Sequence, residues 1–231
     1  YRIFILTGKN SFYKSKANTI FENLLKDKIC LFYFKQNYLP EIKELQKIIL
    51  SINKFKPDLI IAIGGGAVLD YAKSANVLHK SKKIKNLILN SLFDFKKNYC
   101  KLLAIPTTAG SGAEVTSNSV IYIKDIKHSI EHENLKPDFF FLIPELIIKS
   151  SIVIKSSAGF DAISQAVESL ISKKSNGDSI KFSEQSLKLS LNNYIHYLNK
   201  PNKENSFKML LAANLSGKAI SITKTTAPHA V

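Results

Sequence analysis

Short apolar runs and helical repeats alternate along the first part of the chain. The apolar runs are rich in β-branched and aromatic residues, which is typical of buried strands, and they occupy residues 1–8, 29–34 and 57–66. The helical repeats place apolar residues at intervals of three and four, and they occupy residues 16–27, 40–55 and 67–80. Because strand and helix follow each other in turn, the pattern predicts a parallel sheet covered on both faces.

The pattern between residues 81 and 147 is less regular. Ser81–Asn98 is polar and rich in lysine, so we expect an irregular surface connection there. A further strand is predicted at 101–108, followed by a loop and by a hairpin at 118–132. The apolar run at 136–147 predicts one more buried strand, which Pro144 closes.

Strand patterns vanish after about residue 150. Three segments with helical periodicity follow, near 157–172, 178–199 and 203–224. The sequence therefore predicts two domains, an α/β domain at 1–148 and a helical domain at 149–231.

Composition indicates a globular protein. The chain has 231 residues, of which 45% are hydrophobic, enough for one large core or two modest ones. Its apolar runs are all shorter than the roughly 18 residues that span a bilayer, and Cys30 and Cys100 stand alone, as reduced thiols do. We therefore expect a cytoplasmic protein with no membrane partner. The chain opens at Tyr1 without an initiator methionine, so we also expect it to be a piece of a longer protein.

The formal net charge of +15 raises the question of a nucleic-acid partner. Arg2 is the only arginine, and the lysines are scattered over every segment without the aromatic interleaving of an RNA-binding sheet. The charge pattern therefore favours a small-molecule partner and no nucleic acid.

Two loops after predicted strands could hold a nucleotide. Gly64, Gly65 and Gly66 lie between a strand and a helix, where backbone N–H groups can approach a phosphate; a tight turn without ligand is the alternative. The second loop follows the strand at 101–108 and is rich in hydroxyl groups, at Thr107, Thr108 and Ser111. Ligands of open parallel sheets bind at the carboxyl ends of strands, so the two loops together favour a nucleotide.

Four segments, taken in order, resemble a known family. The strings "GGGAVLDYAK", "IPTTAGSGAEVTS", "GFDAISQAVES" and "TTAPHA" are similar to those of the iron-containing (group III) alcohol dehydrogenases, relatives of glycerol dehydrogenase and dehydroquinate synthase. The resemblance implies a Rossmann-like N-terminal domain, an all-helical C-terminal domain, a nicotinamide cofactor and a divalent metal, Fe²⁺ or Zn²⁺. It also implies a homodimer.

The resemblance assigns cofactor-binding residues position by position. Gly64, Gly65 and Gly66 match the pyrophosphate-binding turn, with Asp70 and Lys73 on the next helix, and Thr107, Thr108 and Ser111 match the second cofactor loop. Gly8, followed by Lys9, stands where relatives that prefer NAD carry an aspartate. Because no carboxylate would repel a 2′-phosphate and a lysine would attract it, we expect NADP or NAD as the cofactor, with NADP(H) favoured; an ordinary solvated lysine at position 9 is the alternative.

The metal ligands depart from the family pattern. Asp161 matches the family's aspartate and His229 one of its histidines, but Gln165 replaces the histidine expected one helical turn after Asp161. By itself, this segment favours Asp161 as a capping residue near a helix start over Asp161 as a metal ligand. Gln165 is a weaker donor than imidazole, so the sequence leaves the metal open.

The strings around Gln165 and Lys224 also resemble a branch that reduces phosphonoacetaldehyde to 2-hydroxyethylphosphonate during phosphonate biosynthesis. We expect Lys224 to contact the phosphonate; an ordinary lysine at a helix end is the alternative. The leading prediction is thus NAD(P)H-linked, metal-dependent reduction of an aldehyde. The alternatives are a general iron-type alcohol dehydrogenase and a truncated homologue that binds a nucleotide without catalysis.

Overall fold

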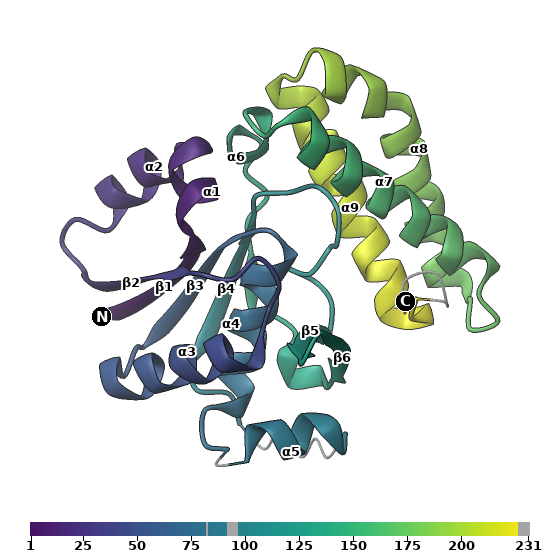
Figure 1. Cartoon of the computed structure of the whole chain (residues 1–231). Helices are drawn as coiled ribbons and strands as arrows, with labels where there is room; N and C mark the ends of the chain where they lie inside the picture. Colours follow the sequence, from purple (N-terminus) through teal and green to yellow (C-terminus); the bar gives the residue numbers. More distant parts are fainter. Residues whose placement is uncertain (82, 92–96, 226–231) are drawn as a thin grey trace. The chain divides into compact units, whose positions relative to one another are not determined.

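The computed structural model describes residues 1–81, 83–91 and 97–225 (Figure 1). The chain divides into two compact units, one formed by Tyr1–Ile105 with Ser117–Phe141, and the other by Pro106–Thr116 with the residues from Leu142 onward. The division therefore differs from a single cut after residue 148. The difference arises because the loop Pro106–Thr116 packs against helices of the second unit.

A five-stranded sheet forms the centre of the first unit, in the order β2-β1-β3-β4-β7. The strands are β1 (Arg2–Gly8), β2 (Ile29–Lys35), β3 (Leu59–Gly64), β4 (Lys101–Pro106) and β7 (Phe139–Phe140). β1 runs parallel to β2 and β3, and β4 runs parallel to β7. With helices between successive strands, this arrangement confirms the predicted α/β architecture.

Helices cover both faces of the sheet (Figure 1). They are α1 (Lys9–Lys14), α2 (Ala17–Leu24), α3 (Ile42–Phe55) and α4 (Gly66–Leu78), whereas the short helix α5 (Ile84–Leu89) contacts the β6 strand (Ile126–Glu131) of the hairpin. α1 and α2 lie on one face, α3 and α4 on the other. α3 buries Leu45, Ile48, Ile49 and Ile52, the one apolar stripe that its sequence repeat predicts.

The structure corrects two expectations in the irregular region. The connection Ser81–Asn98 contains α5, which buries Ile84 and Ile88, although its polar composition suggested no helix. The run at 136–147 is not a buried strand: only Phe139 and Phe140 pair with β4, and they are 56% and 38% exposed. This short strand stands at the edge of the sheet, where one side has no neighbouring strand to cover it.

A two-stranded antiparallel hairpin confirms the prediction for residues 118–132. It consists of β5 (Asn118–Ile123) and β6 (Ile126–Glu131), and the short 3₁₀ helix η1 (Glu133–Leu135) follows it. Ile121, Ile123 and Ile130 of the hairpin are buried. The hairpin packs on α4 and so lies beside the helix that follows the glycine turn.

The second unit is helical, as predicted. Its helices are α6 (Glu145–Ile148), α7 (Ile152–Ile171), α8 (Gly177–Asn199) and α9 (Lys203–Thr223), and the last three lie side by side (Figure 1). α7 begins five residues earlier than expected because the Ser151 hydroxyl caps it, accepting a hydrogen bond from Ile154 N at 3.3 Å. α8 and α9 each begin with a reciprocal cap, between Asn176 and Ser179 and between Asn202 and Asn205.

Small residues let the three long helices pack closely. The buried face of α8 consists largely of serines, at positions 179, 183, 186 and 190. Ser186 Oγ donates to Ala212 O at 2.8 Å, which joins α8 to α9. An apolar cluster that includes Ala109, Ala162, Tyr197 and Met209 fills the centre and holds α7, which carries the candidate metal ligands.

Two further expectations concern the cysteines and the membrane. Cys30 and Cys100 are both free, and burial raises the pKa of the Cys100 thiol to about 12, so this thiol stays protonated at neutral pH. Throughout the described residues, every helix is too short or too polar to cross a bilayer.

Candidate functional site

The carboxyl ends of β1 and β3 form one edge of the first unit. Thr7 pairs with Ile63, so Gly8 and Gly64, the next residues, end neighbouring strands side by side. α1 begins directly after Gly8, and α4 begins at Gly66. The first N–H groups of a helix have no partner within it, and α4 adds a long helix dipole, so this edge favours an anionic ligand.

Close packing is enough to require a glycine at position 64, the first residue of the turn Gly64–Gly66. A Cβ on Gly64 would lie 2.5 Å from Val68 Cγ2, and Val68 N donates to Gly65 O at 3.0 Å as α4 begins. The tight-turn role of Gly64 is therefore built into the structure. A phosphate-binding role for Gly64, Gly65 and Gly66 is compatible with it and stays a prediction.

The turn at Gly8 is polar and free of carboxylates from Thr7 to Ser11. Ser11 Oγ donates to Gly8 O at 3.0 Å and lies 2.9 Å from the point that a Cβ on Gly8 would occupy. Lys9, the first residue of α1, is exposed. The turn thus presents a hydroxyl and an ammonium group at the end of β1.

Asp70 and Lys73 lie on α4, where Asp70 contacts the hairpin and Lys73 is buried. The Asp70 carboxylate accepts a hydrogen bond from Val120 N–H of β5, and Ser74 Oγ lies 2.7 Å from Ser119 Oγ. Burial raises the pKa of Asp70 to about 6, although the charges of Lys73 and Lys127 and the Val120 hydrogen bond oppose the shift. The described contacts thus fix the hairpin to α4. Sequence reasoning missed the hairpin partners of Asp70 because nothing local links them to residue 70.

Asp70 is expected to make the stability of the protein depend on pH. The pKa of Asp70 is about 6 in the folded protein and 3.8 in the unfolded reference, so folding favours the protonated carboxyl. Its contribution to the free energy of unfolding is therefore complete below pH 3.8 and is lost as the pH rises through about 6. Between pH 4 and pH 7, Asp70→Asn should gain up to about 3 kcal/mol of unfolding free energy relative to the wild type. Urea unfolding of the cofactor-free protein at several pH values measures this difference.

Asp27→Asn is the matched control because Asp27 is exposed in the turn before β2. If the difference in unfolding free energy between Asp70→Asn and the wild type stayed constant from pH 4 to pH 7, burial would not raise the pKa of the Asp70 carboxyl.

The second predicted cofactor loop, Pro106–Thr116, is held tightly in the second unit. A Cβ on Gly110 would lie 2.9 Å from Ala158 O of α7, and Glu114 Oε1 accepts from Asn214 Nδ2 of α9 at 3.0 Å. Thr107 is buried, whereas Thr108 and Ser111 are half-buried. The loop therefore offers the hydroxyls of Thr108 and Ser111 on a rigid backbone.

Asp161 and Gln165 lie one turn apart on the same side of α7. Asp161 is half-buried, and Gln165 is 4% exposed with its Oε1 accepting from Ser216 Oγ of α9 at 3.2 Å. His229 lies outside the described residues. The described residues contain no group of three His, Cys, Asp or Glu side chains that could hold a metal. Asp161 and Gln165 both carry side-chain oxygens that a divalent ion can bind, and their role as metal ligands stays a prediction.

Lys224 directly follows α9. Its N–H donates to Ile220 O at 2.8 Å, and its backbone adopts φ = 63°, in the left-handed region that non-glycine residues rarely occupy. Its side chain is half-buried. The position fits both a lysine at the negative end of a helix dipole and a phosphonate contact.

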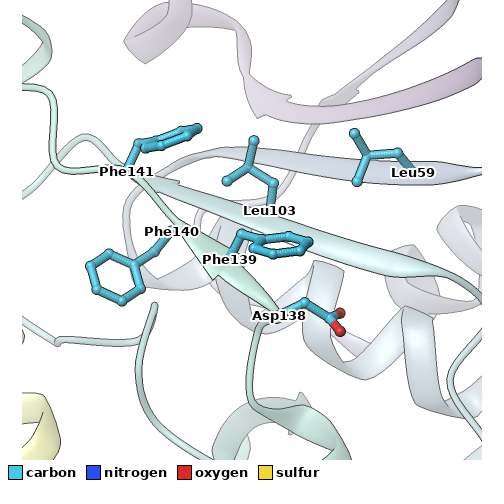
Figure 2. Close-up of a pocket in the computed structure, with 6 residues that line it drawn as sticks. All are labelled: Leu59, Leu103, Asp138, Phe139, Phe140 and Phe141. Carbon is cyan, nitrogen blue, oxygen red and sulfur yellow. The ribbon is translucent and has the colours of Figure 1, made fainter.

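An apolar groove of about 460 Å³ lies at the β7 edge of the first unit (Figure 2). It is lined by Leu59, Leu103, Asp138, Phe139, Phe140 and Phe141. Its one carboxylate, Asp138, already accepts from Lys101 Nζ at 2.6 Å and from Leu102 N at 2.9 Å. The groove therefore offers no group for hydride or proton transfer.

The chain is similar to several alcohol dehydrogenases and to an aldehyde reductase, among them two proteins of solved structure and one sequence relative. An iron-containing alcohol dehydrogenase from Thermotoga maritima matches it in structure with a TM-score of 0.88 and 29% identity, over 99% of this chain and 64% of that one. A sulfoacetaldehyde reductase from Bifidobacterium kashiwanohense, solved with NAD⁺, gives a TM-score of 0.89 and 25% identity, over 99% of this chain and 61% of that one. An NADPH-dependent butanol dehydrogenase from Clostridium saccharobutylicum is 28% identical over 79% of this chain and 48% of its own length.

The chain thus spans about half to two thirds of the length of these relatives. A sequence profile described as iron-containing alcohol dehydrogenase matches residues 1–144, more than half of the chain. The chain belongs to the iron-containing alcohol dehydrogenase family.

Proposed function

We propose that this chain takes part in the NAD(P)H-linked, metal-dependent reduction of an aldehyde to an alcohol. The observation that carries the proposal is the pair of strand ends at Gly8 and Gly64, which lie side by side and are each followed by a helix within two residues. That edge suits the pyrophosphate of a dinucleotide, with the glycine turn at Gly64–Gly66 as its cradle. Thr108 and Ser111, on the loop Pro106–Thr116 of the second unit, stay predicted cofactor contacts.

NADP(H) is the cofactor that the turn at Gly8 favours. Glycine at this position removes the carboxylate that would repel a 2′-phosphate, and Lys9 and Ser11 supply a cation and a hydroxyl. The Lys35 side chain passes the same turn, with Cε 3.9 Å from the position of a Cβ on Gly8, and its ammonium group donates to Asn37 O and Tyr38 O. Among the relatives, one is described as NADPH-dependent and another was solved with NAD⁺, so the family accommodates both cofactors.

Iron is the metal that membership of the family favours. Asp161 and Gln165 would hold it together with His229, and Ser216 would orient the Gln165 amide through its hydrogen bond. A bound divalent ion supplies a Lewis acid that polarises the substrate oxygen. Replacement of a histidine by Gln165 gives the site a neutral oxygen donor, so we expect weaker metal binding than in relatives with histidine at this position.

Phosphonoacetaldehyde is the substrate that we favour, with Lys224 as the contact to its phosphonate. The sulfoacetaldehyde reductase neighbour supports an anionic two-carbon aldehyde, because a sulfonate there takes the place of the phosphonate. A general iron-type alcohol dehydrogenase is the second candidate, in line with the butanol dehydrogenase relative. A homologue that only binds the nucleotide is the third. A cytoplasmic location and a homodimer stay predictions.

Substituting Gly8 tests the cofactor assignment. In the wild type, the dissociation constant for NADPH should be about tenfold lower than that for NADH, and Gly8→Asp should reverse the order by placing a carboxylate beside the 2′-phosphate. The variant should fold because the nearest atom to its Cβ is the rotatable hydroxyl of Ser11. Calorimetric titration measures both constants; equal affinity of the wild type for the two cofactors would contradict the assignment.

Turnover separates the three candidate functions. With Fe²⁺ added, NADPH oxidation should be faster with phosphonoacetaldehyde than with butanal, and Lys224→Ala should reduce only the first rate. Equal rates with both aldehydes would favour the general alcohol dehydrogenase. Cofactor binding without metal binding or turnover would favour the nucleotide-binding homologue.

A further inference from the structure

The loop that follows β2 is held by three side chains. Glu44 of α3 accepts hydrogen bonds from Gln36 N and, at 2.9 Å, from Asn37 N. Lys35 Nζ donates to Asn37 O and, at 3.2 Å, to Tyr38 O. The Tyr71 hydroxyl accepts from Glu41 N at 2.7 Å and lies 3.0 Å from Glu44 Oε2. Almost every residue of this loop is therefore fixed through its backbone.

Such an arrangement is costly for an ordinary surface loop. Glu44 is 3% exposed and Tyr71 is fully buried, so a carboxylate and a hydroxyl have been removed from water to hold a short connection. Burial and the nearby Glu44 charge raise the pKa of Tyr71 far above its usual range. A loop that only joins β2 to α3 could satisfy the same backbone groups with water.

Tyr38 stands out in this rigid loop because its side chain is 91% exposed. The backbone carbonyl of Tyr38 is bonded, but the described residues do not cover its ring. A rigid backbone that presents an uncovered aromatic ring loses little conformational entropy when a planar ligand stacks on it.

The position of Tyr38 connects it to the predicted cofactor edge. Lys35, the last residue of β2, pairs with Gly8, the last residue of β1. The Lys35 side chain passes Gly8, with Cε 3.9 Å from the position of a Cβ there, and its Nζ reaches Tyr38 O. One lysine side chain thus joins the turn that we assign to the adenosine ribose with the backbone of Tyr38.

We propose that Tyr38 provides the stacking face for the adenine ring of the dinucleotide, and that Glu44 and Tyr71 act as positioning residues for it. The inference rests on the proposed function, because it takes the end of β1 as the site of the adenosine half. Base stacking uses the face of an aromatic ring and does not depend on a pattern of hydrogen bonds, which fits a tyrosine that is 91% exposed.

Tyr38→Ala and Tyr38→Phe test the proposal by calorimetric titration. The alanine variant should bind NADPH and 2′,5′-ADP about tenfold more weakly than the wild type, by the same factor for both ligands. It should bind nicotinamide mononucleotide, which lacks adenine, as the wild type does. The phenylalanine variant keeps the ring and should bind all three ligands normally.

Tyr1→Ala is the matched control, since Tyr1 is 86% exposed but precedes β1 at the opposite end of that strand. Unchanged binding of 2′,5′-ADP by Tyr38→Ala would overturn the role of Tyr38 while leaving the cofactor site intact. A wild type that binds neither NADPH nor 2′,5′-ADP would instead overturn the proposed function. Because Tyr38 is exposed, its variants should fold, and equal thermal midpoints would verify this.

Discussion

Gly217→Val is expected to lower the free energy of unfolding of the second unit by more than about 4 kcal/mol. A Cβ on Gly217 would lie 2.7 Å from Gly112 O and 2.8 Å from Gly112 Cα. Both neighbours are backbone atoms, and Gly112 has φ = 58°, so neither can move without distorting the loop Pro106–Thr116. Urea unfolding followed by circular dichroism at 222 nm measures the effect.

Gly177→Ala is the control for this experiment. Gly177 opens α8, and a Cβ added there meets no atom within 4 Å. The variant should be as stable as the wild type, or more stable by up to about 1 kcal/mol, because alanine restricts the unfolded chain. If Gly217→Val unfolded at the same urea concentration as Gly177→Ala, the loop would not approach α9 as closely as described.

Glu44→Ala should destabilise the first unit by about 3 kcal/mol and loosen the loop after β2. The substitution removes the acceptor of Gln36 N and Asn37 N and leaves the Tyr71 hydroxyl without its carboxylate neighbour. Because two donors and a buried hydroxyl lose a partner at once, the effect should exceed that of one ordinary hydrogen bond. Urea unfolding gives the free energy, and amide exchange at Gln36 and Asn37 gives the local effect.

Glu41→Ala is the matched control because Glu41 is exposed and its side chain makes no capping hydrogen bond to α3. We expect its stability to change by less than about 0.5 kcal/mol. Protected amides at Gln36 and Asn37 in Glu44→Ala would show that the loop keeps its conformation without the carboxylate, and would remove Glu44 as a positioning residue for Tyr38.

Local sequence patterns were sufficient for the regular elements. The apolar run that ends at Gly64 and the helix that begins at Gly66 follow directly from residue types, as does the apolar stripe of α3. The same patterns misjudged β7, because an apolar run such as Phe139–Phe141 does not reveal whether it lies in the centre or at the edge of a sheet. They also missed α5, whose two buried isoleucines stand among lysines and asparagines.

Site residues were predictable only where a motif is local. Gly8 and Gly64 could be expected at one edge because parallel strands end together, and the register of β1 and β3 agrees. The hairpin partners of Asp70 could not be expected, since Val120 and Lys127 are far from it in sequence. His229 lies outside the described residues, so the metal site stays a prediction for Asp161, Gln165 and His229 together.

The sequence by itself determined the alternation of β1 to β4 with α2, α3 and α4, the hairpin and the three long helices α7 to α9, because these depend on contacts between residues that are near in the chain. Only the tertiary structure decided that the loop Pro106–Thr116 belongs with the helices, through the close approach of Gly112 to Gly217. It also decided that Glu44 and Tyr71 would hold the loop of Tyr38. Such contacts join residues far apart in the chain, and no local propensity encodes which distant backbone a glycine or a buried carboxylate will meet.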